Sequence, residues 1–181
     1  MLIAVVVGVY FGFIAKNGDD NEDESTTKSA AEEIFTPDEE KGAVNPLTGE
    51  GGYNEDALKV RPVAVVVENE YSTESVRPQW GLNKADIVLE GESEFSTRML
   101  LFFADYTKVP EQVGPARSAR PPFIRFSQLF DCIFIHAGLS RSKGNYEGAD
   151  AVFKNEGIDH YYLLSGAENG VYFGRDKSRT S

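Results

Sequence analysis

The segment Pro122-Phe-Ile-Arg-Phe-Ser-Gln-Leu-Phe130, followed directly by Asp131-Cys-Ile-Phe-Ile-His136, decides the fold class of this chain. In the first part, apolar residues recur at helical spacing, and proline is tolerated in the first turn of a helix. These apolar residues are Phe123, Phe126, Leu129 and Phe130. The second part is an apolar run of the length of a strand. A helix that leads directly into a buried strand is typical of α/β proteins.

Further strands and one further helix are expected on both sides of this unit. The run Val63-Ala-Val-Val-Val67 follows Arg61-Pro62 and is apolar without alternation, which predicts a strand that is covered on both faces. Residues 87–90 and 99–104 predict two more strands, and residues 161–164 and 171–173 predict short ones. Residues 146–155 predict a helix that Gly157 ends. Strands separated by helices indicate an α/β sheet.

An apolar segment opens the chain. Residues 1–15 carry no charged side chain, and their number fits a short membrane anchor or the core of an export signal. No small-x-small cleavage site and no lipid-attachment cysteine follow this segment. We therefore interpret residues 1–16 as a membrane anchor or signal core, with an uncleaved single-pass anchor favoured. This predicts a partner membrane for residues 1–15 and a folded domain outside the cytoplasm, at the cell membrane.

The negative charge of the chain is concentrated next to this segment. The formal net charge is −11, and residues 17–56 hold 13 acidic and 2 basic residues, a net of −11. Residues 17–58 are polar and cannot bury enough apolar surface to fold, so we expect an acidic flexible linker. Residues 57–181 hold 16 acidic and 15 basic residues, a net of −1. The expected domain, residues 59–181, therefore lacks the basic surface that nucleic-acid binding requires.

The sequence contains few side chains that could bind a transition metal or form a disulfide. The chain has one cysteine, Cys132, and two histidines, His136 and His160. One thiol cannot form an intrachain disulfide, and so few cysteines and histidines make a transition-metal cluster improbable. Cys132 lies in an apolar run, which predicts a buried and inert thiol. We expect no metal and no cofactor.

The sequence Arg117-Ser118-Ala119-Arg120 is the most distinctive candidate site. Two planar guanidinium groups ahead of a helix start, together with backbone N–H groups, could bind a carboxylate or phosphate. An alternative is that the arginines pair with internal carboxylates such as Glu90, Glu92 or Glu94 and fix loops. Both interpretations remain open. The candidate ligand-binding residues are Glu90, Arg98, Arg117, Ser118, Arg120, His136, Arg175 and Arg179.

A second candidate site is the acidic stretch that contains Glu90, Glu92 and Glu94. Alternate positions would place the three carboxylates on one side of an extended chain, where they could serve glycoside hydrolysis or bind a hard cation. An exposed acidic hairpin is the favoured interpretation. His136 ends a predicted strand just before Gly138. A histidine at the end of a strand in an α/β sheet is well placed to line a cleft.

Three functional hypotheses follow from these residues. The first is a binding module for an anionic envelope ligand or a peptide carboxylate, held in an arginine-lined cleft. The second is an envelope hydrolase that uses Glu90 or Glu92 with His136. The third is a scaffold whose exposed aromatic residues, such as Trp80 and Tyr146, dock a protein partner. No motif in the sequence decides whether the protein is an enzyme.

Several short phrases occur in a fixed order along the chain: Asn45-Pro-Leu-Thr-Gly49, Arg61-Pro-Val-Ala-Val65, Arg77-Pro-Gln79, Gly114-Pro-Ala-Arg-Ser-Ala-Arg120 and His136-Ala-Gly138. Together they resemble the YerB-like family of bacterial envelope proteins, many of them lipoproteins, whose domain has no known function. The resemblance implies an α/β layered sandwich, here a mixed β-sheet with flanking helices. It also implies a family chain that continues well past Ser181, so we expect the domain to be truncated at its C-terminus. No enzymatic activity is implied.

Overall fold

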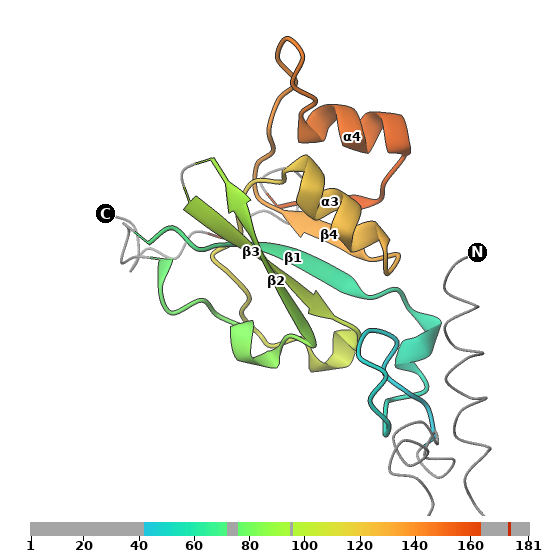
Figure 1. Cartoon of the computed structure of the whole chain (residues 1–181). Helices are drawn as coiled ribbons and strands as arrows, with labels where there is room; N and C mark the ends of the chain where they lie inside the picture. The colour runs from blue at the N-terminus through green and yellow to red at the C-terminus, as the bar shows by residue number, and fades with distance from the viewer. Residues whose placement is uncertain (1–41, 72–75, 95, 164–173, 175–181) are drawn as a thin grey trace, which may run out of the picture. The chain divides into compact units, whose positions relative to one another are not determined.

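The computed structural model describes residues 42–71, 76–94, 96–163 and 174, and Figure 1 shows the arrangement of their elements. Residues 1–41, which include the expected anchor and most of the expected linker, lie outside this set. The expected strand at 171–173 and the candidate residues Arg175 and Arg179 also lie outside it. No helix among the described residues is both long enough and apolar enough to cross a membrane.

Five strands form one mixed sheet in the order β2-β3-β1-β4-β5. β2 and β3 form an antiparallel hairpin, β3 pairs antiparallel with β1, and β4 lies parallel to both β1 and β5. The predicted α/β class and mixed sheet are therefore confirmed. The strands are β1 (Val63–Glu68), β2 (Ile87–Ser93), β3 (Ser96–Phe103), β4 (Ile133–His136) and β5 (His160–Tyr162).

Two α-helices cover one face of the sheet, α3 (Pro121–Gln128) and α4 (Ala149–Glu156) (Figure 1). Prolines occupy the first turn of α3, where the missing N–H costs nothing. Gly157 ends α4 in the left-handed conformation, with φ of 63°. The core beneath the helices includes Val66, Phe102, Phe123, Phe134 and Val152. Burial of these side chains is the main stabilising contribution on this face.

The buried face of α3 differs from the face that the sequence predicts. Phe123, Ile124 and Ser127 are buried, whereas Phe126 is 44% and Leu129 is 72% exposed. The helix is only eight residues long, so its contact with the sheet is set by adjacent positions 123 and 124 rather than by a longer stripe. Two of the apolar residues at helical spacing, Phe126 and Leu129, therefore lie outside the core.

Short 3₁₀ turns and loops supply the apolar residues that cover the other face of the sheet. Val65, Val67, Leu101 and Phe103 form the core there, and the partly buried residues packed against them include Leu82, Val109 and Val113. This second cover explains why β1 is apolar without alternation. The 3₁₀ turns of the described chain are η1 (Ala57–Lys59), η3 (Leu82–Lys84) and η4 (Tyr106–Lys108).

Part of the stretch expected to form the end of the linker contacts the folded domain. Asn45 is buried, and its amide donates to Asp86 Oδ1 at 2.7 Å. The other oxygen of Asp86 accepts a hydrogen bond from the backbone N–H of Ala104 at 2.8 Å. Leu47 packs against the core beneath the helices. The Asn45-Pro-Leu sequence therefore holds the start of the domain to the end of β3.

Candidate functional site

The Arg-Ser-Ala-Arg sequence lies between the carboxyl ends of two parallel strands. β1 and β4 pair over only three residues each, and beyond them the chain around Arg117 fits between the two strands. The N–H of Arg117 donates to Val66 O at 2.9 Å, and its carbonyl accepts from the N–H of Ala137 at 2.9 Å. Open α/β sheets commonly bind ligands where parallel strands separate in this way. The fold therefore places the arginine sequence where a ligand site is expected.

Gly138 makes this close approach feasible. Its φ is +90°, and a Cβ atom at this position would lie 2.4 Å from Ser118 Oγ. The N–H of Ala119 donates to the carbonyl of Gly138 at 2.9 Å, which holds the two segments together. Only glycine fits both the backbone conformation and the neighbouring hydroxyl.

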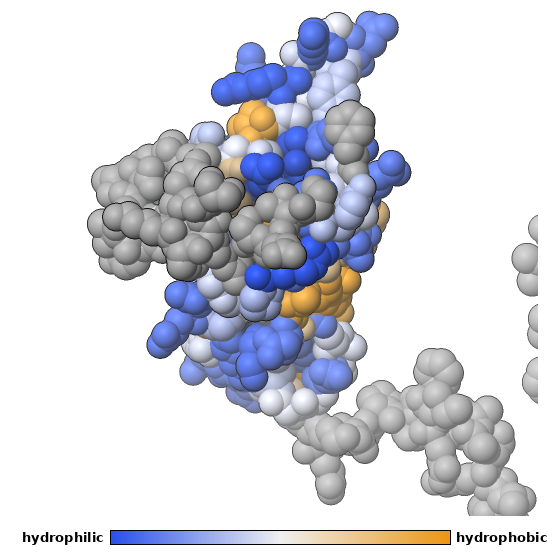
Figure 2. Space-filling view, turned by 90° about the vertical axis from the view of Figure 1, so that its left-hand side faces the viewer, coloured by the Kyte–Doolittle hydropathy of each residue, from blue (hydrophilic) through white to orange (hydrophobic). Residues whose placement is uncertain are grey.

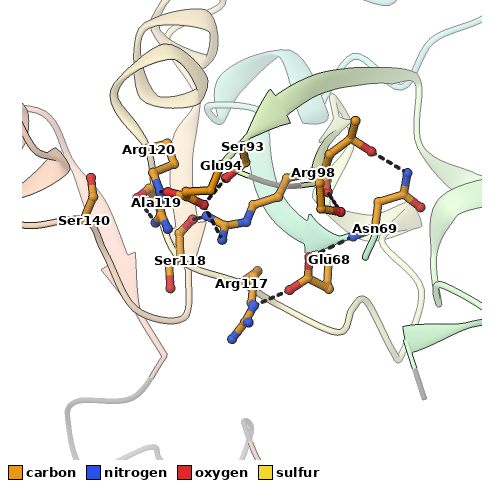
Figure 3. Close-up of polar contacts among 12 residues, drawn as sticks. Glu68, Asn69, Ser93, Glu94, Arg98, Arg117, Ser118, Ala119, Arg120 and Ser140 are labelled. Atoms are coloured by element: carbon orange, nitrogen blue, oxygen red, sulfur yellow. Dashed lines mark hydrogen bonds and ion pairs between the residues drawn. The ribbon is translucent and has the colours of Figure 1, made fainter. Parts of the chain in front are cut away.

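Arg98 comes from β3 and is almost completely buried, with 7% of the residue exposed. Its Nη1 donates to the carbonyl of Ser118 at 2.8 Å, and its Nη2 donates to Glu94 Oε2 at 3.3 Å (Figure 3). Burial lowers the pKa of Arg98 below its ordinary value, and the nearby Arg120 lowers it further. This guanidinium joins β3 to the Arg-Ser-Ala-Arg sequence, and both of its terminal nitrogens are engaged.

Glu94 neutralises two of the three arginines. It lies in the turn between β2 and β3 with φ of 54°, and one of its oxygens accepts from Nε of Arg120. The other oxygen accepts from Arg98 and from the hydroxyl of Ser93, at 2.7 Å from Ser93 Oγ. The hydrogen bond from Arg120 is the main cause that lowers the pKa of Glu94. Arg98 and Arg120 therefore have an internal partner, as the alternative interpretation of the sequence predicted.

Arg117 is different from the other two arginines. Its Nε donates to the carboxylate of Glu68, a residue at the end of β1 that is 7% exposed. The Arg117 side chain itself is 54% exposed. Within the described part of the chain, its two terminal amino groups have no hydrogen-bond partner. Arg117 thus presents two terminal nitrogens that no described residue engages (Figure 3).

A small polar pocket lies next to Arg117, with a volume of about 160 Å³. The charged side chains that line it are three carboxylates and two guanidinium groups, so its lining has no excess of positive charge. Figure 2 faces the end of the molecule that carries the β2–β3 turn, and the visible surface there is mainly hydrophilic. The pocket is lined by Glu68, Glu70, Ser93, Glu94, Ser96, Arg98 and Arg117. Of these residues, Arg98 and Arg117 were predicted as ligand-binding residues and Glu94 as part of the acidic stretch. The other four were not predicted as site residues: Glu68, Glu70, Ser93 and Ser96.

His136 does not line this pocket. It is fully buried on the face covered by α4, where its ring stacks with Phe153 and Tyr162. Both ring nitrogens are engaged, Nδ1 at 2.6 Å from Gly138 O and Nε2 at 2.9 Å from His160 Nδ1. The predicted position of His136 in an open cleft was therefore wrong.

The residues proposed for hydrolysis are not brought together. Glu90 lies on the sheet face opposite to His136, and two strands, β3 and β1, separate β2 from β4. β2 and β4 are thus three strand spacings apart, which corresponds to about 14 Å. Glu90 instead accepts hydrogen bonds from Asn69 and Thr97 at 2.9 and 2.5 Å.

The acidic stretch does not form the expected row of three carboxylates. Glu90 and Glu92 are exposed on β2, whereas Glu94 has left the extended conformation and turns toward the arginines. The described residues include no group of three or more side chains arranged to hold a metal ion.

Neither of the two aromatic residues considered for partner docking is among the residues that line the pocket. Trp80 is partly buried, and its backbone pairs with Gly114. Tyr146 is 49% exposed, and its hydroxyl lies 3.1 Å from Ser140 Oγ.

The fold and the site define an α/β domain with an ion-paired arginine cluster and a small polar pocket. Residues 47–181 match the family model described as "Protein of unknown function (DUF3048) N-terminal domain", and the chain belongs to this family. The chain is 42% identical over 133 residues to "Putative lipoprotein YerB" of Bacillus subtilis (strain 168), covering 72% of this chain and 38% of that protein. The predicted resemblance to the YerB-like family is therefore confirmed.

A solved structure agrees with this assignment. The crystal structure of the YerB protein from Bacillus subtilis is similar, with a TM-score of 0.57 and 40% sequence identity. The similarity covers 67% of this chain and 38% of that chain. This chain thus spans less than half the length of its relative.

Proposed function

We propose that this domain is a membrane-associated, extracytoplasmic binding module in which Arg117 binds the anionic group of an envelope ligand. The observation that carries the proposal is the pair of terminal Arg117 nitrogens, which have no hydrogen-bond partner within the described part of the chain. A guanidinium edge can donate two parallel hydrogen bonds to a carboxylate or phosphate. Because Glu68 holds Nε, the edge is already oriented before a ligand arrives.

The lining of the pocket restricts the chemistry of the ligand. Two guanidinium groups and three carboxylates surround the space, so a simple anion gains little from the total charge. Ser93 and Ser96 add hydroxyl groups that can both donate and accept. The ligand that fits best carries one anionic group for Arg117 together with hydroxyl or amino donors for the carboxylates. Short peptides and glycan–peptide fragments of the envelope have this combination.

Membrane association rests on the sequence and on the relative. The similar protein of Bacillus subtilis carries the name "Putative lipoprotein YerB", and lipoproteins are attached to membranes by lipid. In the present chain, residues 1–15 are apolar and uncharged, and an acidic stretch follows them. We propose that residues 1–16 act as a single-pass anchor and that the acidic stretch separates the domain from the membrane surface.

A thermal-shift screen of the full 181-residue chain tests the binding proposal. The probes are inorganic phosphate, short peptides with free carboxyl termini, and glycan–peptide wall fragments. A probe at 100 times its dissociation constant should stabilise the protein by about 2.7 kcal/mol. The decisive variant is Arg117→Lys, because lysine can keep the ion pair with Glu68 but cannot present a second pair of donors.

The matched control is Arg141→Ala, which removes an arginine whose side chain is 78% exposed, away from the pocket. The proposal predicts that a probe stabilises the wild type and Arg141→Ala but has little effect on Arg117→Lys. Equal stabilisation of all three proteins would show that the bound probe does not use Arg117. No stabilisation by any probe would contradict the binding module and favour a purely structural role for the arginines.

A further inference from the structure

The two histidines of the chain are in direct contact. His136 ends β4 and His160 begins β5, and the two strands pair in parallel. His136 Nε2 lies 2.9 Å from His160 Nδ1. The chain has no other histidine. Histidine is the side chain whose ordinary pKa lies near neutral pH, and here both histidines share one hydrogen bond.

The neighbouring groups determine where the protons lie. The carbonyl of Gly138 can only accept, so His136 Nδ1, at 2.6 Å, must carry the proton. In the neutral ring, His136 Nε2 is then an acceptor. His160 Nδ1 must therefore donate to it. The hydrogen bonds run in one direction, from His160 through His136 to the carbonyl of Gly138.

The surroundings of His136 do not favour a positive charge. Its ring is completely buried, and its centroid lies 5.1 Å from those of Phe153 on α4 and Tyr162 on β5. Phe134 approaches it from β4. Burial lowers the pKa of His136 to about 4; the Gly138 carbonyl raises it and His160 lowers it further.

The titratable groups that face this pair come from β5 and from the chain just before it. His160 and Tyr162 face His136 from β5, whereas α4 and β4 contribute the phenylalanines. Asp159 acts on His160 and raises its pKa, but burial has the larger effect and the pKa of His160 is lowered. Asp159 is itself paired with Arg61 at 2.6 Å. No carboxylate hydrogen-bonds to either imidazole among the described residues.

β5 is a short edge strand with few contacts to the sheet. It is three residues long, and β4 is its only described partner strand. One backbone hydrogen bond just beyond its end runs from the N–H of Leu163 to His136 O at 2.9 Å. A second backbone hydrogen bond, from the N–H of Phe134 to Asp159 O at 3.4 Å, precedes the strand, and the ring of His160 stacks on Phe153 with 3.8 Å between the centroids. The side-chain bond between the histidines adds to this small set of contacts.

We propose that the His136–His160 hydrogen bond is an acid-sensitive latch, which holds β5 on the sheet near neutral pH and releases it on acidification. A proton added to His136 Nε2 would turn the acceptor of this bond into a donor and place it against another donor. If His160 were also charged, two cations would lie in contact. Release of β5 relieves both conflicts, because the histidines then become solvated.

The direction of the pH dependence follows from proton linkage. A released histidine binds its proton near the ordinary pKa of 6.5, whereas the latched His136 does so only near 4. The released state therefore binds more protons between these values. The stabilisation of β5 by the His136–His160 bond is therefore fully present above pH 6.5. It decreases as the pH falls and is lost near pH 4.

Hydrogen–deuterium exchange of the full chain, followed by mass spectrometry, tests the latch. The protection of a peptide that covers residues 158–163, corrected for the intrinsic exchange rate, should fall roughly 50-fold between pH 7 and pH 4.5. A peptide from β3 should take up no deuterium over the same labelling time, because only β5 is released. Equal uptake by both peptides would indicate global unfolding and overturn the proposal, as would constant protection of residues 158–163.

Two variants at one position separate the latch from general acid sensitivity. In His136→Gln, the amide can still accept from His160 but does not titrate, so β5 should stay protected at both pH values. In His136→Phe, the bond is lost, so β5 should be less protected at pH 7 and show little further loss at pH 4.5. If β5 is released by acid in both variants as in the wild type, His136 is not the latch.

Discussion

Arg98 and Glu68 lie directly opposite each other on β3 and β1, yet each hydrogen-bonds to a different partner. Arg98 donates to Glu94 and to the carbonyl of Ser118, whereas Glu68 accepts from Arg117. These bonds join the Arg-Ser-Ala-Arg sequence to both β1 and β3, and they join the β2–β3 turn to β3. Arginines that would repel one another are thereby separated by carboxylates.

This arrangement predicts a large structural cost for losing Arg98. Arg98→Met keeps much of the side-chain length but leaves the carbonyl of Ser118 without its donor and Glu94 with one arginine fewer. Because Arg98 is buried, we expect the free energy of unfolding to fall by about 2–4 kcal/mol. Urea unfolding measures this change. Arg141→Ala should leave the urea midpoint unchanged, and an equal loss in both variants would contradict the structural role of Arg98.

The close contact between Gly138 and Ser118 predicts strong intolerance to a side chain at position 138. Gly138→Ala combines a positive φ with a Cβ atom 2.4 Å from Ser118 Oγ, so the cost should exceed about 2 kcal/mol. Gly157 also has a positive φ, but its added Cβ would meet nothing within 4 Å, so Gly157→Ala should cost about 1 kcal/mol. Thermal unfolding compares the two.

A double variant checks the cause. Adding Ser118→Gly to Gly138→Ala removes the clash but not the backbone strain, so part of the lost stability should return. No recovery would show that the clash with Ser118 is not what makes Gly138→Ala costly.

The thiol of Cys132 should be unreactive in the folded protein. It is completely buried, and burial raises its pKa to about 12, so almost no thiolate is present at neutral pH. A colorimetric thiol reagent should label less than one equivalent in buffer over minutes and one equivalent in denaturant. Rapid labelling of the native protein would contradict the burial of Cys132.

Global stability should decrease on acidification. Because the pKa of His136 is lowered to about 4 in the folded state, the unfolded chain binds the extra proton as the pH falls below 6.5. Between pH 7 and pH 4.5 this removes about 2 kcal/mol. Below pH 4.5, protonation of Glu94, whose pKa is also lowered, acts in the same direction. Urea unfolding at the two pH values should show a clearly smaller loss for His136→Gln, and an equal loss would point to other groups.

The elements were predictable from local patterns, whereas the partners of the site residues were not. Apolar runs identified the strands, and Gly157 was correctly placed at the end of α4. Glu68 gave no comparable signal, because its role depends on its position opposite Arg98 in the register of two antiparallel strands.

The position of His136 could have been recognised from strand alternation. Positions 134 and 136 of a strand point to the same face, and Phe134 belongs to the helix-covered core. Gly138, which follows closely, instead favours an open loop at this strand end. His160, the partner of His136, lies 24 residues away and depends on the parallel pairing of β4 and β5.

The most direct test of the proposed binding site is ¹⁵N NMR of the arginine side chains of the full chain, recorded during titration with a probe that stabilises it. The terminal guanidinium signals of Arg117 should shift with the added probe. The signals of Arg98 and Arg120, which are held by Glu94, should remain in place. Shifts at Arg98 or Arg120 without a shift at Arg117 would contradict ligand binding through Arg117.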